Sequence, residues 1–231
     1  MKQKRNLKNL IIVTVFALLL IVPFIALEML NNVLTNGRSS RSWLENKFGT
    51  ELSRVYPTQN VEDLFKEFPD GFKVEQSYWE KEDIIEVTVI GNSHNHTIGG
   101  TLVHSRDNKI LDTIKIEYKE NKFIFSDEDK AKTLWPYNGF LFQHLSIDKS
   151  FLSSQKLKDK QYSFQNGDFG LQYKLANVTI SKYLKIHHQK NYNLVFGGSN
   201  SNTGYYYSVS VENSRDITDF DFSEIISDTK N

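Results

Sequence analysis

Two histidines separated by one residue, His94 and His96, are the side chains whose type and spacing come closest to a chemical site. On a β-strand their imidazoles would project to the same side, and neutral imidazole is a common ligand of zinc and copper. A structural zinc site needs four protein ligands and a catalytic one usually three, but no nearby acid or third histidine completes a recognised spacing. The flanking residues 91–93 are typical of a polar hairpin turn. We therefore favour a solvated turn without a metal, and a metal-dependent enzyme centred on this pair is the alternative.

No other group of residues has the pattern of a catalytic or cofactor site. The chain contains no cysteine, so a thiol nucleophile is excluded, and no serine lies in the glycine pattern of a nucleophile elbow. The acidic run 127–129 lacks the spaced oxygen ligands of a calcium loop and predicts a helix N-terminus. The pair at 187–188 (HH) is typical of a helix C-terminus, where a cation is favourable. The sequence predicts a protein that is not an enzyme and that uses no cofactor.

A polar loop is the stronger candidate for a functional surface. Residues 197–204 read GGSNSNTG, with three glycines and no apolar side chain. Such loops on a rigid scaffold often carry recognition, and tyrosine adds contact area with a polar tip. The candidate binding surface consists of Ser199, Asn200, Ser201, Asn202, Tyr205 and Tyr207. The alternative is that the tyrosines are half-buried strand residues.

The N-terminal residues predict where the protein acts. Residues 10–27 contain no charged side chain and follow four basic residues, Lys2, Lys4, Arg5 and Lys8. As a helix the segment would be roughly 27 Å long, close to the roughly 30 Å of a bilayer core. The basic head predicts a cytoplasmic N-terminus and an external remainder at the cell membrane. A cleaved secretory signal and a peripheral helix are the alternatives.

The chain is expected to contain four successive segments. They are a cytoplasmic basic head at 1–9, a transmembrane anchor at 10–30, a stalk at 31–40, and an extracytoplasmic domain at 41–231, with a subdivision near 126–150 left open. The 28 basic and 28 acidic residues balance, and without the four basic residues of the head the remainder has an excess of four acidic residues. That balance gives no electrostatic footprint for nucleic acid.

Local patterns predict helices and antiparallel strands in the domain. Helices are expected at 42–55, 60–68, 126–135 and 177–184, with helical pieces between 137 and 160. Strands are expected at 85–89, 97–104, 110–118, 122–125, 169–175, 192–196 and 205–211, with a final strand at Phe220 and Phe222. The expected fold class is α+β, an N-terminal transmembrane helix followed by antiparallel sheet with a few flanking helices.

Several of these segments resemble a known family. Residues 56–65 (YPTQNVEDLF), followed by 70–73 (DGFK), are similar to the "YPxxNLEDLYD…DGEF" opening of the staphylococcal tandem lipoproteins, the conserved staphylococcal antigen family. Trp79 then precedes a meander, as in that family. Residues 170–175 (GLQYKL) and 204–211 (GYYYSVSV) resemble two of its C-terminal strands.

The resemblance extends over most of 54–222 and implies an α+β extracytoplasmic domain on the outer face of a Gram-positive membrane. It implies no enzymatic role, and members of the family have been linked to host-cell contact and immune recognition. They are held by a lipidated cysteine, which this chain lacks. Properties that depend on the lipid therefore do not carry over.

The sequence thus predicts a membrane-anchored, non-enzymatic binding module at the cell surface. Its expected partners are the membrane and a host or envelope protein. Two alternatives remain open, an extracytoplasmic enzyme that uses the histidine pair and an accessory or immunity partner of an envelope or secreted protein.

Overall fold

The computed structural model describes most of the chain after residue 36. The described residues are 37, 39–80, 82–137, 139–186, 192–201, 204–213 and 220–229. The predicted head and anchor, 1–30, lie outside them, as does most of the predicted stalk. The chain divides into two compact units, 1–44 and 45–231. In the first unit the structure describes the start of one helix, where Ser40 Oγ accepts a hydrogen bond from the Trp43 N–H at 3.3 Å.

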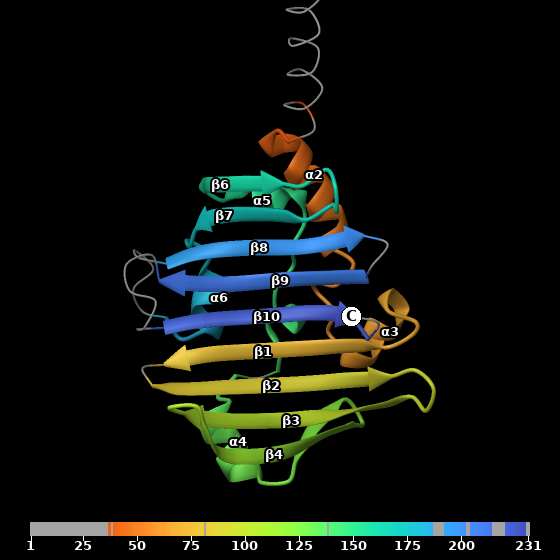
Figure 1. Ribbon diagram of the computed structural model, residues 1–231, viewed down its shortest axis with the longest axis vertical. Coiled ribbons are helices and arrows are strands. Elements are labelled where there is room, and N and C mark those ends of the chain that lie inside the picture. Colours follow the sequence, from red (N-terminus) through yellow and green to blue (C-terminus); the bar gives the residue numbers. More distant parts are fainter. Residues whose placement is uncertain are drawn as a thin grey trace, which may run out of the picture. The chain divides into compact units, whose positions relative to one another are not determined.

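A single antiparallel sheet of ten strands dominates the second unit (Figure 1). The strands are β1 Phe72–Glu80, β2 Asp83–Asn92, β3 Thr97–Arg106, β4 Lys109–Lys119, β5 Lys122–Phe125, β6 Leu157–Tyr162, β7 Phe169–Lys174, β8 Tyr192–Ser201, β9 Gly204–Asn213 and β10 Phe220–Asp228. Their order is β5-β4-β3-β2-β1-β10-β9-β8-β7-β6. Two meanders, β1–β5 and β6–β10, are therefore joined where the last strand pairs with the first, with Val74 opposite Ile226.

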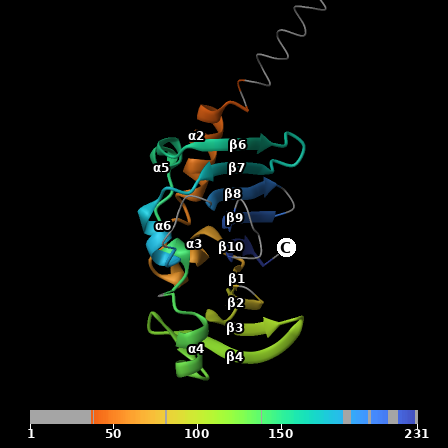
Figure 2. The same ribbon diagram turned by 90° about the vertical axis from the view of Figure 1, so that its left-hand side faces the viewer.

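The helices are short and lie along one face of the sheet (Figure 2). They are α2 Arg41–Leu52, the 3-10 helix η1 Val61–Asp63, α3 Leu64–Glu67, α4 Glu128–Leu134, the 3-10 helix η2 Leu141–Gln143, α5 Lys149–Ser154 and α6 Val178–Tyr183. Asn60, Asp127 and Asn177 each accept a backbone N–H at a helix start, which confirms the helix starts expected there.

The hydrophobic core lies between the helices and the sheet. In β2 the alternation predicted from the sequence is confirmed, because Ile85, Val87 and Val89 are buried while Glu86 is exposed. The opposite face of the sheet has no helix over it in the described residues (Figure 2), as antiparallel sheets allow. The alternation along each strand therefore determines which of its side chains face the core.

The fold class predicted from the sequence is wrong. The structure is mostly one antiparallel sheet with short helices along one face instead of an α+β domain, and the predicted transmembrane helix lies outside the described residues. The capping signals were correct for several helix starts, but four of the five α-helices in the described residues are only four to seven residues long. Within the described residues, no helix has the length and apolar character needed to cross a membrane.

Candidate functional site

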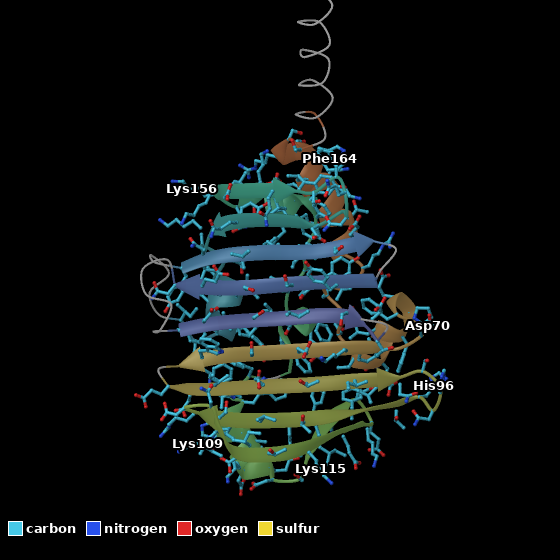
Figure 3. All side chains as sticks on the ribbon, in the orientation of Figure 1. Asp70, His96, Lys109, Lys115, Lys156 and Phe164 are labelled. Carbon is cyan, nitrogen blue, oxygen red and sulfur yellow. The ribbon has the colours of Figure 1, made fainter. Side chains whose placement is uncertain are left out.

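The histidine pair lies in the turn between β2 and β3, where both side chains are exposed. His96 has a left-handed backbone (φ 49°), lies at the tip of the turn (Figure 3) and contacts Phe65, with ring centroids 5.8 Å apart. Asn92 Oδ1 accepts the His94 N–H at 2.9 Å, as in other polar turns. No group of three or more metal-ligating side chains occurs in the part of the chain that the structure describes. The two imidazoles are therefore not held side by side on a strand.

The eight-residue loop predicted at 197–204 is wrong. Residues 197–201 belong to β8 and residue 204 to β9, and Ser201 pairs with Gly204, so the connection has only two residues. The two strands therefore pair as far as Ser201 and Gly204, where the sequence predicts an open loop.

The structure describes the side chains of only two residues of the predicted binding surface, Ser199 and Tyr207. Tyr207 is fully buried and Ser199 is 6% exposed, with Ser199 Oγ donating to the Asn166 carbonyl at 3.2 Å. Asn202 and the side chains of Asn200, Ser201 and Tyr205 lie outside the described residues. Tyr206 in β9, which was not a candidate, is exposed.

The structure instead contains an aromatic-lined pocket of about 460 Å³ at the β5 end of the sheet. It lies between the β4–β5 hairpin, α4 and residues 135–147, which connect α4 to α5 and which we call the strap. Its lining is Gln59, Tyr118, Asn121, Lys122, Phe123, Phe125, Glu128, Ala131, Lys132, Trp135, Tyr137, Gly139, Gln143 and His144. A volume of this size is typical of a small-ligand site.

The alternation of β5 creates the aromatic wall of the pocket. Phe123 and Phe125 face the helices, whereas Ile124 points to the open face and is 46% exposed. Glu120 and Asn121 adopt positive φ (52° and 62°) in the two-residue turn before β5, the conformation that favours tight hairpins. The short edge strand is thus fixed in register by its turn.

Trp135 organises the aromatic cluster behind the opening. Its ring centroid lies 5.7 Å from Phe123, 6.0 Å from Phe125 and 5.2 Å from Phe140, all at steep angles. Edge-to-face contacts of this kind stabilise aromatic groups beyond their buried area. The indole N–H donates to Gln76 Oε1 on β1 at 2.6 Å, so the ring is held from behind by the sheet.

A buried carboxylate on β10 anchors the strap. Glu224 Oε2 accepts the Leu141 N–H at 2.6 Å and Gln76 Nε2 at 2.7 Å, and Oε1 accepts the Phe142 N–H at 2.8 Å and the Tyr56 hydroxyl at 3.4 Å. Burial raises the pKa of Glu224 to about 7, although the four donors oppose the shift. Glu224 therefore holds the strap at Leu141 and Phe142 over the middle of the sheet.

The rim of the pocket carries more basic than acidic side chains. Lys122, Lys132 and Glu128 line it, and Lys132 Nζ lies 3.9 Å from Glu128 Oε2. Glu128 Oε1 also accepts the Phe125 N–H at 3.0 Å. An aromatic interior with a basic rim suits a ligand that combines an apolar group with negative charge.

A second polar cluster joins β2, β3 and β4 to α4. His104 lies between two carboxylates, with Nε2 2.9 Å from Asp83 Oδ1 and Nδ1 3.2 Å from Asp112 Oδ2. Arg106 makes a two-pronged contact with Asp83 at 2.8 Å, and Lys130 Nζ donates to Asp112 at 2.6 Å. The hydrogen bond to Asp83 raises the pKa of His104. Both ring nitrogens already face carboxylates, so the arrangement is a structural clamp and not a general base.

Sequence reasoning missed the pocket although a signal was present. The segment Lys122–Phe125 was predicted as a strand, and its aromatic alternation together with Trp135 marks an aromatic face at the sheet edge. The sequence does not show that the strap crosses this face. The strap is held there by the hydrogen bond between Leu141 and Glu224, which are 83 positions apart in the chain.

Comparisons with known proteins add no family assignment. No protein-family model matches the chain. No curated protein matches it either.

Proposed function

We propose that this protein is a non-enzymatic binding module and that the aromatic pocket between β5, α4 and the strap is its binding site. The observation that carries the proposal is a cavity of about 460 Å³ whose walls include Phe123, Phe125 and Trp135. Solvent-accessible aromatic walls with a few polar rim groups are typical of binding sites. Among the described residues that line the pocket, none forms a nucleophile–base pair.

The proposal includes a location at the outer face of a Gram-positive cell membrane. It is supported by the apolar segment 10–27 with its basic head, and by the resemblance of 56–65 to the staphylococcal tandem lipoproteins. Protease added to intact protoplasts is expected to release a fragment that begins near 31–41. Protection of the domain until the membrane is breached would reverse this orientation.

The pocket is tested with a small aromatic anion, naphthalene-2-sulfonate, titrated calorimetrically into the full-length protein in a mild detergent. Binding is expected, and Phe123→Ala should weaken it by about 10-fold, because one aromatic wall is lost from an apolar contact.

Ile124→Ala is the matched control, since this neighbouring side chain lies on the opposite face of the same strand. It should change the affinity by less than about twofold. Absence of binding, or equal effects of the two substitutions, would refute the assignment of the pocket.

A further inference from the structure

The pocket adjoins the outer edge of β5, where backbone N–H and C=O groups face away from β4. β5 is the terminal strand and pairs only with β4. The Ser126 N–H donates to the Lys115 carbonyl at 3.0 Å, toward β4, whereas the Phe125 N–H donates to Glu128 Oε1. Backbone groups in an antiparallel strand alternate between the two sides, so the N–H and C=O of Phe123 point outward with those of Phe125.

The outward-facing N–H groups of Phe123 and Phe125 differ in whether they have a hydrogen-bond acceptor. Glu128 takes the place of a partner strand at Phe125. At Phe123 no intramolecular hydrogen bond to the N–H is present in the part of the chain that the structure describes. The backbone of Phe123 is therefore able to pair with another strand, directly beside the aromatic pocket.

We propose that the ligand of the pocket is an extended peptide segment that pairs with β5 at Phe123 and inserts one large apolar side chain into the pocket; this rests on the proposed function. A residue opposite Phe123 exchanges both backbone hydrogen bonds with it in an antiparallel pair. Directly opposite residues project to the same face of a sheet. The side chain of that residue consequently enters on the helix side, where Phe123 lines the pocket.

Charge on the rim selects the flanking residues of the peptide. The exposed Lys122 and Lys132 lie beside the opening, and Glu128 is already engaged by the Phe125 N–H. Acidic residues next to the apolar anchor would meet these lysines. The partner is therefore an acidic peptide segment with a central aromatic residue, bound by strand addition.

The short edge limits the strength of this pairing. Edge strands are commonly protected by being short or by charged side chains, and β5 has four residues with Glu128 covering one rung. Only a segment that also fills the pocket gains enough to bind. The pocket thus supplies specificity to an edge that would otherwise pair with any strand.

The test uses the blocked peptide acetyl-Glu-Thr-Phe-Thr-Glu-amide, titrated into the full-length protein in the detergent used for the aromatic anion. Replacement of its phenylalanine by alanine is expected to weaken binding by about 10-fold or more. N-methylation of that phenylalanine removes the hydrogen bond to the Phe123 carbonyl and should weaken binding by about 3- to 10-fold. N-methylation of the following threonine, whose N–H points away from β5, is the matched control and should have less than about a twofold effect.

The outcomes separate the two proposals. If naphthalene-2-sulfonate binds but the peptide does not, or if both N-methylated peptides bind equally, strand addition is wrong and the pocket takes a small molecule. If neither probe binds, the proposed function fails as well. A peptide with lysines in place of its glutamates should bind more weakly, and equal binding would contradict the role of the rim lysines.

Discussion

Replacement of Glu224 by alanine is expected to lower the free energy of unfolding by about 3–5 kcal/mol, as for other buried charged groups whose partners are left behind. The substitution removes the acceptor of the Leu141 and Phe142 N–H groups and of Gln76 Nε2. Buried donors without an acceptor each cost about 1–3 kcal/mol. Urea unfolding followed by circular dichroism measures the change.

Ser223→Ala is the matched control for Glu224→Ala. Ser223 is the neighbouring residue on the open face, where its Oγ accepts a hydrogen bond from Ser210 Oγ at 3.3 Å. Its loss should cost less than about 1 kcal/mol. Equal destabilisation by the two substitutions would show that the carboxylate does not anchor the strap.

The same carboxylate predicts how stability changes with pH. The pKa of Glu224 is raised from 4.5 to about 7 in the folded state, so the folded protein holds its proton more tightly than the unfolded chain. Stability from this group is present below pH 4.5 and is lost as the pH rises to about 7, by about 3 kcal/mol. Glu224→Ala should flatten the stability profile over that interval.

His104 adds to this decline in a separable way. The hydrogen bond to Asp83 raises the pKa of His104 above 6.5, so its stabilisation is present below pH 6.5 and is lost above it. His104→Gln should therefore remove the part of the decline above pH 6.5 and leave the part between pH 4.5 and 6. At acidic pH the relevant group is Asp83. Its hydrogen bond with Arg106, and to a lesser extent the one with His104, lowers the pKa of Asp83 to about 2. The stabilisation that comes from ionised Asp83 is therefore lost only below pH 3.8.

Much of the sheet follows from local patterns in the sequence, but the apolar pattern is interrupted in the two central strands. The strands β2 to β5 were predicted, and buried and exposed residues alternate in β2 and in the second half of β4. β1 and β10 each carry a polar residue at a core-facing position, Gln76 and Glu224. These two residues interrupt the apolar alternation of the two central strands. They are buried because they bond to each other and to the strap, which local patterns do not show.

The sheet edges were harder to predict for a different reason. β6 consists of Leu157–Tyr162 (LKDKQY), whose charged side chains are exposed as expected for an edge strand. Such a segment has no apolar alternation, so a strand there is visible only from its pairing with β7. The binding pocket has the same dependence, because it is bounded by an edge strand and by a strap with no regular pattern.

Gly100→Ala is expected to lower the free energy of unfolding by about 3 kcal/mol or more, at the upper end for overpacking. A Cβ at this position would lie 1.8 Å from the Thr88 carbonyl oxygen, and that oxygen belongs to the backbone of β2. It cannot move without separating β2 from β3, where Gly100 pairs with Val89. Gly100 is therefore the position in β3 at which the backbones of β2 and β3 approach most closely.

Gly99→Ala provides the comparison, because both glycines are in β3 and neither has a positive φ. A Cβ at Gly99 would lie 3.0 Å from the Ile116 carbonyl oxygen, a distance that a small shift relieves. Loss of backbone freedom in the unfolded chain favours alanine by about 0.4–1 kcal/mol, so Gly99→Ala should change stability by no more than about 1 kcal/mol. If urea unfolding gives similar values for both variants, close contact between β2 and β3 does not require Gly100. A large loss of stability in Gly100→Ala alone would show that the meander β1–β5 needs a glycine where the Cα of residue 100 approaches the Thr88 carbonyl oxygen. This is the meander that carries β5 and its pocket.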